Sequence, residues 1–259
     1  MPKVLFEKRD RIAYVTLNRP DSKNAIDHET DALLWKAWED FRDDPELDVA
    51  ILTGTGDAFC AGADLKTYIP DWAGATPQRV RQNVAHGLGG LTRGLHRIYK
   101  PVIAAVNGWA LAGGLELALA CDIRVASERA MFGSFEARRG FHHGDGGIVR
   151  LVNICGVGVA LEMLLTAEAV GAEKALRFNL VSRVVPHSSL MAEAEAIAAQ
   201  ILRNEQYAVR SAKETILDVI GRPVDDQLRI EALNGYSSGG PGTADRLQLF
   251  FHGTEPERK

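Results

Sequence analysis

The sequence contains few of the residues that build disulfide frameworks or metal sites. Three of its 259 residues are cysteines, Cys60, Cys121 and Cys155, and no pair of them has the Cys-x-x-Cys spacing. An odd number of widely separated cysteines disfavours both a disulfide framework and a zinc site. A nucleotide-binding motif and a serine-nucleophile motif are missing as well. We therefore expect a protein that holds no metal and works in a reducing compartment, the cytoplasm.

Excess positive charge and an uninterrupted apolar segment are also absent. The net charge is −4 and the pI is near 6.0, whereas a nucleic-acid-binding domain carries a basic face. Residues 102–121 are mostly apolar, but Asn107, Glu116 and a Gly-Gly pair favour a buried strand and helix over a membrane span. The first ten residues carry charges where a secretory signal has its apolar stretch. We expect neither a nucleic acid nor a membrane as partner.

The periodicity of the apolar residues indicates an α/β protein. Residues 11–18 alternate as a strand does, and Asp27 can cap a helix whose apolar residues recur at spacings of three and four. A second strand is predicted over residues 49–53, and the same order of strand, helix and strand recurs from residue 102. Alternation of this kind is typical of α/β architecture and not of segregated α+β folds.

The C-terminal part of the sequence predicts a run of helices. Amphipathic patterns begin at Ser188 or Ser189, at Val209 and at Asp225, and a break at residues 237–242 precedes a last short helix. We divide the chain into a core with the active site, residues 1–200, and a helical oligomerisation region, residues 201–259. A unit of roughly 60 residues buries too little surface for a core of its own, so it should pack on the core or on another subunit.

Two glutamates are the strongest candidates for catalysis. Glu116 follows the Gly113-Gly114 pair, and Glu136 follows a short strand-like tract. Two carboxylates in one apolar pocket cannot both ionise freely, so one pKa rises and the pair can divide into a base and an acid. Addition of water to a double bond needs both.

Several longer motifs carry a resemblance to a known family. They are Val15-Thr-Leu-Asn-Arg-Pro20, Phe59-Cys-Ala-Gly-Ala-Asp64-Leu-Lys66, Gly113-Gly114-Leu-Glu116-Leu-Ala and Phe132-Gly133-Ser-Phe-Glu136. In this order, and over nearly the whole chain, they resemble the crotonase family, the enoyl-CoA hydratases and isomerases. The resemblance implies a ββα-spiral core, a C-terminal helical region that forms a homotrimer or a dimer of trimers, and an acyl-CoA thioester substrate. It implies no cofactor, because coenzyme A is part of the substrate.

The resemblance also implies roles for individual residues. The backbone N–H groups of Ala63 and Gly113 match the oxyanion hole that binds the thioester oxygen. Glu116 and Glu136 match both glutamates of the hydratases, and isomerases of the family commonly keep one. We therefore predict an enoyl-CoA hydratase that adds water across the 2,3 double bond. The alternatives are isomerisation or hydrolytic carbon–carbon cleavage on the same scaffold and, more remotely, RNA binding, which the net charge of −4 disfavours.

Further residues are expected to bind the substrate. Lys23 and Lys66 adjoin motifs that line the coenzyme A entrance in the family, and Tyr68 and Trp109 are candidates for the acyl pocket, although core packing explains the aromatic pair equally well. The remaining candidates lie in or near the matched motifs: Ala61, Asp64, Leu65 and Asp145.

The stretch after Glu136 departs from the pattern of the family. Phe135 stands where hydratases usually have proline, and the usual Gly-x-x-Pro-Gly-x-Gly-Gly reads Gly140-Phe-His-His143-Gly-Asp145-Gly-Gly. Asp145 has two interpretations. It caps the helix that begins after it, or it faces the acyl pocket with His142 or His143 as its partner.

Overall fold

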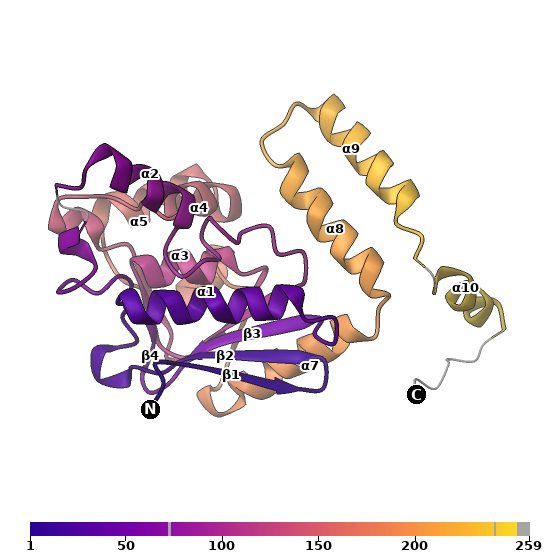
Figure 1. The fold of residues 1–259 in the computed structure, drawn as a ribbon, viewed down its shortest axis with the longest axis horizontal. Coiled ribbons are helices and arrows are strands. Elements are labelled where there is room, and N and C mark those ends of the chain that lie inside the picture. Colours follow the sequence, from indigo (N-terminus) through magenta and orange to yellow (C-terminus); the bar gives the residue numbers. More distant parts are fainter. Residues whose placement is uncertain (72–73, 241, 253–259) are drawn as a thin grey trace.

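Two β-sheets and the helices that pack on them make up the body of the protein (Figure 1). The computed structural model describes residues 1–71, 74–240 and 242–252. Within these residues one sheet has the strand order β1-β2-β3-β5-β7-β10 and the other has the order β4-β6-β8-β9. The strands are β1 (Val4–Arg9), β2 (Ile12–Leu17), β3 (Val49–Gly54), β4 (Ala58–Cys60), β5 (Val102–Val106), β6 (Trp109–Leu111), β7 (Ile123–Ser127), β8 (Met131–Gly133), β9 (Val170–Gly171) and β10 (Arg183–Val185).

The helices fall between and after these strands. The α-helices are α1 (His28–Asp43), α2 (Pro77–His86), α3 (Gly113–Ala120), α4 (Gly147–Cys155), α5 (Val157–Thr166), α6 (Ala172–Arg177), α7 (Leu190–Leu202), α8 (Gln206–Val219), α9 (Val224–Ser237) and α10 (Thr243–His252). Short 3-10 helices are η1 (Pro20–Ser22), η2 (Ile69–Asp71), η3 (Glu136–Arg139) and η4 (His187–Ser189). No helix among the described residues is long and apolar enough to cross a membrane.

A repeated unit of two strands and one helix generates the architecture. In β3-β4-α2, β5-β6-α3 and β7-β8-α4, the first strand joins the larger sheet, the second joins the smaller sheet, and a helix follows. The first strands pair in parallel with one another, and so do the second strands. This succession is the ββα spiral that the resemblance implies, so the predicted fold class is confirmed.

Apolar side chains cover the larger sheet on both faces. Along β3, Ala50 and Leu52 point into one hydrophobic cluster while Val49 and Ile51 point into another. Helix α1 contributes to the first cluster and α7 to the second, and Figure 1 shows these helices on opposite sides of the sheet. Because both faces are buried, the central strands read as continuous apolar runs instead of alternating with polar residues.

Local sequence signals explain most element boundaries. The Asp27 carboxylate accepts a hydrogen bond from the Thr30 N–H at 2.9 Å, so the predicted cap of α1 is confirmed. Ser189 precedes α7 as predicted, but its side chain makes no capping hydrogen bond. The turn predicted between β5 and α3 contains the additional short strand β6, which has no sequence signal of its own because it is three residues long.

The last three helices lie apart from the sheets. Helix α7 packs against β3, β5 and β7, whereas α8 packs mainly against α9. Figure 1 shows α8, α9 and α10 extending beyond the body of the protein. In this single chain, large apolar side chains on these helices are exposed, among them Leu233, Tyr236 and Phe250. The division of the chain near residue 200 stays a prediction.

Candidate active site

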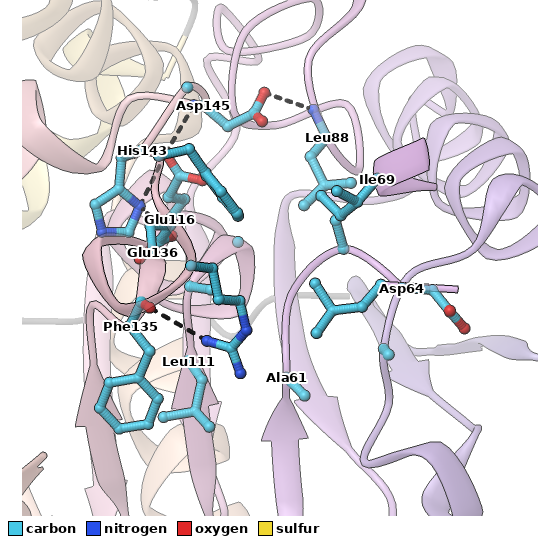
Figure 2. Close-up of a pocket in the computed structure, with 18 of the residues that line it drawn as sticks. Ala61, Asp64, Ile69, Leu88, Leu111, Glu116, Phe135, Glu136, His143 and Asp145 are labelled. Atoms are coloured by element: carbon cyan, nitrogen blue, oxygen red, sulfur yellow. Dashed lines mark hydrogen bonds and ion pairs between the residues drawn. The ribbon is translucent and has the colours of Figure 1, made fainter. Parts of the chain in front are cut away.

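A cavity of about 390 Å³ opens where the segment after β4, the start of α3 and the segment from Phe135 to Asp145 meet. Figure 2 shows Glu116, Glu136, His143 and Asp145 on one side of it and Ala61 and Asp64 on the other. The structure places nine of the predicted site residues in its wall: Ala61, Ala63, Asp64, Leu65, Lys66, Gly113, Glu116, Glu136 and Asp145.

Glycines allow the backbone at Ala63 to approach the start of α3 closely. A Cβ atom on Gly113 would lie 3.3 Å from the Ala63 nitrogen and 2.3 Å from Cδ2 of Leu88. A Cβ atom on Gly62 would lie 2.7 Å from the Gly113 nitrogen. No described residue accepts a hydrogen bond from the N–H group of Ala63 or of Gly113. Two free N–H groups that face one cavity, one of them at a helix N-terminus, are suited to bind an oxyanion.

Ala112, just before α3, has an unusual backbone conformation. Its φ and ψ are 52° and −123°, a region that costs a residue with a side chain of order 1–3 kcal/mol. Its N–H donates to the Gly133 carbonyl at 2.9 Å, which ties this turn to β8. The strain fixes the direction in which the following N–H, that of Gly113, points.

Glu116 lies in the first turn of α3, and its side chain is 4 % exposed. Its Oε1 accepts hydrogen bonds from the N–H of Asp145 at 2.7 Å and from the N–H of Gly147 at 2.9 Å. Gly147 is the first residue of α4, so the positive end of that helix helps to hold the carboxylate. No described residue donates a hydrogen bond to Oε2, which leaves that oxygen available to water or substrate.

Glu136 is the first residue of η3 and lies on the same side of the cavity as Glu116. Its Oε2 accepts a hydrogen bond from Oγ of Ser134 at 3.2 Å, and the side chain is 4 % exposed. One carboxylate oxygen of Glu136, one of Glu116 and one nitrogen of His143 lie within 4.8 Å of one another. The two glutamates therefore share one buried site.

His143 lies between the two glutamates, a position that no sequence motif indicated. Its Nδ1 lies 2.8 Å from Oε1 of Glu136 and 3.3 Å from Oε1 of Glu116, and the side chain is 1 % exposed. Neither ring nitrogen forms a well-directed hydrogen bond with a described residue, so these contacts are ion pairs set by proximity. Burial alone lowers the pKa of His143, but the adjacent carboxylates outweigh it and raise the pKa to about 9.

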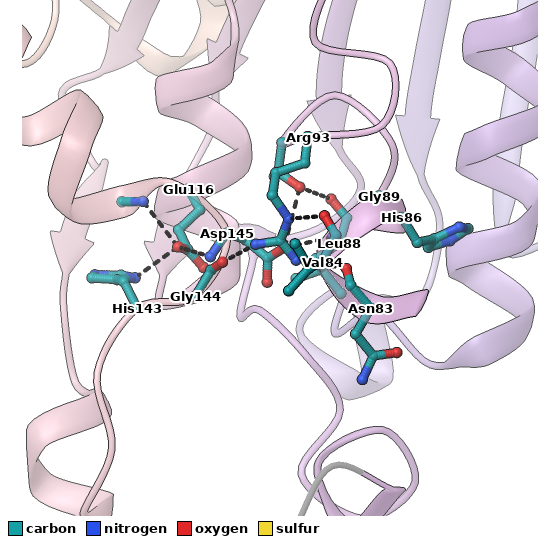
Figure 3. Close-up of polar contacts among 12 residues, drawn as sticks. Asn83, Val84, His86, Leu88, Gly89, Arg93, Glu116, His143, Gly144 and Asp145 are labelled. Atoms are coloured by element: carbon teal, nitrogen blue, oxygen red, sulfur yellow. Dashed lines mark hydrogen bonds and ion pairs between the residues drawn. The ribbon is translucent and has the colours of Figure 1, made fainter. Parts of the chain in front are cut away.

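Asp145 connects Glu116 to the opposite wall of the cavity (Figure 3). While its N–H donates to Glu116, its carboxylate accepts from the Leu88 N–H at 2.8 Å and forms an ion pair with Arg93 at 3.0 Å. Burial, and then the charge of Glu116, raises the pKa of Asp145.

The structure contradicts two predictions about Asp145. It does not cap α4, because Gly146 occupies the N-cap position and the carboxylate that bonds to the N-terminus of that helix is that of Glu116. Its partner is neither His142 nor His143, since His143 contacts the glutamates and Nδ1 of His142 contacts the carbonyl of His143. Three glycines around Asp145 allow the chain to turn its carboxylate toward Leu88 instead.

Three predicted substrate contacts do not line the cavity. Lys23 is exposed and forms an ion pair with Asp57. Tyr68 stacks on His28, with ring centroids 4.9 Å apart, and packs against the core. Trp109 lies at the outer end of β6 and is 37 % exposed, whereas Leu111, at the other end of that strand, reaches the cavity. Proximity in sequence to a motif did not indicate where these side chains point.

Other residues of the cavity wall were not predicted from the sequence. Leu88, Phe135 and Phe141 give the wall apolar surface, and Arg139 adds a cation whose Nη1 donates to the Phe135 carbonyl at 3.2 Å. Phe135 and Phe141 flank η3, and the departure of Phe135 from the family pattern was the available signal.

Glu116, Glu136 and His143 are also the one group of side chains in the described part of the chain whose type and spacing suit a metal ion. A metal ligand must be deprotonated, and the raised pKa of His143 means that a proton competes for the same nitrogen. The cluster is therefore suited first to holding and moving a proton.

Comparisons with known proteins agree with this geometry. A model of the enoyl-CoA hydratase/isomerase family matches residues 7–239. The chain is 40% identical to the (E)-benzylidenesuccinyl-CoA hydratase of Thauera aromatica, over 82% of this chain and 80% of that protein. It is 37% identical to the crotonyl-CoA hydratase of Syntrophomonas wolfei, over 88% of this chain and 86% of that protein. The crystal structure of an enoyl-CoA hydratase from Bacillus anthracis superimposes with a TM-score of 0.88 at 33% identity, over 99% of both chains.

Proposed function

Because the chain belongs to the enoyl-CoA hydratase/isomerase family, we propose that it adds water across the 2,3 double bond of an enoyl-CoA thioester. The observation that supports this most is the meeting of two buried glutamates and two free backbone N–H groups in one cavity. An enolate is formed when water adds to C3 of the thioester, so the site needs donors for its oxygen and an acid and a base for the protons.

Each group has a role in the proposed mechanism. The N–H groups of Ala63 and Gly113 donate to the thioester oxygen and stabilise the negative charge that develops on it. One glutamate takes a proton from the water as its oxygen bonds to C3, and the other delivers a proton to C2. The free Oε2 of Glu116 makes this residue our choice for the glutamate that holds the water.

The relatives act on thioesters with different acyl groups. By their names, one hydrates a benzylidenesuccinyl thioester and another a crotonyl thioester. The cavity wall joins apolar surface from Leu88, Phe135 and Phe141 to the cation of Arg139. A test panel should therefore contain short, aromatic and carboxylate-bearing enoyl-CoA thioesters. Coenzyme A enters as part of the substrate, and we propose that the reaction needs no other cofactor.

Mass spectrometry of the products tests the proposal. A gain of one water from any thioester of the panel is the expected result. An unchanged mass with a moved double bond would instead identify an isomerase, and fragmentation would identify carbon–carbon cleavage. Either outcome would replace hydration as the assigned reaction while keeping the acyl-CoA site.

We also propose that the protein is a homo-oligomer built from trimers. The apolar side chains of α8, α9 and α10 are exposed in the single chain, and contiguous exposed apolar surface is typical of protein interfaces. Contacts with other copies of the chain would cover this surface.

A further inference from the structure

His143 holds a position that the two-glutamate mechanism does not use. A single atom, Nδ1, approaches both carboxylates, at 2.8 Å from Glu136 and 3.3 Å from Glu116. The ring packs directly on Gly147, where a Cβ atom would lie 2.6–2.9 Å from it, so the imidazole has little room to turn away. The side chain is 1 % exposed and its close polar contacts are with the two glutamates, so we place its effect on the reaction with them.

We propose that His143 is a positioning residue that relays a proton between Glu116 and Glu136. This inference rests on the proposed hydration. In each turnover one glutamate gains a proton from water and the other loses one to C2, so the pair must exchange a proton before the next turnover. The protonated imidazole first donates its Nδ1 proton to the glutamate that has lost one, and Nδ1 then accepts the proton of the other glutamate.

The relay balances without a further reactant. One water molecule supplies the hydroxyl group that bonds to C3 and the proton that Glu116 receives. Glu136 gives its proton to C2, and the proton on Glu116 then passes through Nδ1 of His143 to Glu136. After this transfer the three side chains carry the protons with which they began. In dehydration the same steps run backwards.

The charged groups around His143 allow it to hold the proton at neutral pH. Glu116 faces it from α3 and Glu136 from η3, and their carboxylates raise its pKa to about 9. Asp145, just before α4, and Arg150, in that helix, interact electrostatically with Glu116 and carry opposite charges when both are ionised. Nδ1 of His142 contacts the His143 carbonyl. Deprotonation of the cluster in alkaline solution therefore removes the proton that the relay moves.

The pH dependence of turnover tests the relay. Wild-type kcat should fall with an alkaline limb near pH 9, because His143 loses its proton there. His143→Asn keeps a polar atom near the Nδ1 position but cannot titrate. We expect it to lower kcat by about 10- to 100-fold, to leave KM within about threefold, and to abolish the alkaline limb near pH 9. His96→Asn, the same change at an exposed position outside the cavity wall, is the control and should keep the wild-type profile.

Two results would overturn the relay. One is a wild-type kcat that stays constant from pH 8 to 10, a result that can be obtained without any variant. The other is a His143→Asn enzyme that folds and keeps both its kcat, within about twofold, and its alkaline limb. If the Asn variant does not fold, His143→Gln takes its place.

A second measurement separates the relay from the proposed reaction. In an NMR titration of the imidazole, we expect the His143 pKa near 9 in the wild type and a lower value in both Glu116→Gln and Glu136→Gln. If no thioester is hydrated but His143 still titrates as expected, the proposed reaction is rejected and the sharing of a proton within the cluster is supported. Hydration with a His143 pKa that neither glutamate affects would reject the relay alone.

Discussion

At the scale of single residues, the site depends on which atoms approach the two carboxylates. Backbone N–H groups fix Glu116, a serine hydroxyl donates to Glu136, and one imidazole nitrogen lies between them. Each carboxylate thus keeps its orientation before the substrate binds. Preorganised groups need no rearrangement at the moment of reaction, which is where most of their catalytic benefit arises.

Replacement of either glutamate by glutamine should remove proton transfer without removing the binding site. We expect Glu116→Gln and Glu136→Gln each to lower kcat by at least about 100-fold, since general acid or base assistance contributes roughly 10² to 10⁴. Acyl-CoA affinity, measured by calorimetry with a non-reacting analogue, should change little. Glu162→Gln, an exposed change that removes an ion pair with Lys174, is the control and should leave kcat unchanged. Near-normal hydration by either site variant would rule out the two-glutamate mechanism.

Asp145→Asn should change the reaction without weakening the fold. The raised pKa means that ionised Asp145 destabilises the folded state, and this cost grows as the pH rises through the folded pKa. Asparagine resembles the protonated form, so we expect the melting temperature at pH 7 to equal or exceed that of the wild type. This advantage should shrink as the pH falls toward about 4, where the carboxyl protonates even in the unfolded chain.

The same variant should alter substrate preference, because Asp145 positions the Leu88 backbone in the cavity wall. Relative kcat/KM values across the thioester panel are the measurement. A clearly lower melting temperature combined with an unchanged preference would show that Asp145 is only a structural residue.

Sequence patterns predicted the proposed catalytic groups of the cavity wall but not the buried His143 between them. Backbone positions such as Ala63 and Gly113 lie within motifs, so their location followed from those motifs. His143 could not be placed, because its contacts involve α3 and η3 and depend on how three distant segments pack. Tyr68 packs against the core, which was the alternative to a substrate contact, and Trp109 lies at the surface, since a motif fixes the backbone but not the direction of neighbouring side chains.

At the scale of elements, the start of α3 is the most constrained part of the site. Both Gly113 and Gly114 contact the segment after β4, but in different ways. A Cβ atom on Gly114 would lie 2.0 Å from the Cys60 carbonyl oxygen, whereas one on Gly113 would meet mainly the end of the Leu88 side chain. Gly114 is therefore required for packing, and Gly113 keeps space at the proposed oxyanion hole.

Gly113→Ala should consequently lower activity more than stability. Leu88 can rotate away from the new methyl group, which limits the loss of stability. The methyl group still lies close to the Ala63 nitrogen and takes up space in the cavity. We expect kcat/KM to fall by about 10²- to 10³-fold, comparable to the loss of one oxyanion donor. Gly158→Ala is a matched control on α5, where a Cβ atom would meet nothing within 4 Å, and it should leave activity unchanged. Unaltered kcat/KM in Gly113→Ala would remove this position from the proposed oxyanion hole.

Element types followed from the sequence more reliably than element contacts. The cap of α1 and the apolar run of β5 are local signals, and both elements formed as predicted. The short strand β6 escaped prediction, because its pairing with β4 and β8 exists only once the spiral has assembled.

At the scale of the whole molecule, the sheets and the last three helices differ in how they bury apolar surface. Both faces of the larger sheet are covered within the chain, and α7 completes the second face. Helices α8 and α9 have no buried residue in the single chain. Exposed leucine, tyrosine and phenylalanine on several helices are typical of an interface, and the proposed symmetric oligomer of the same chain would cover them.

The oligomer should therefore depend on these helices. We expect light scattering of the full-length protein at micromolar concentration to give the mass of a trimer or a dimer of trimers. Ending the chain at Asn204 should yield monomers or aggregates, since it removes all three helices. Leu233→Asp puts a charge at an exposed apolar position and should weaken assembly, whereas Gln248→Glu adds the same charge at an exposed polar position and should not. A stable full-length monomer would contradict the proposed assembly and leave the apolar surface of α8, α9 and α10 to a different partner.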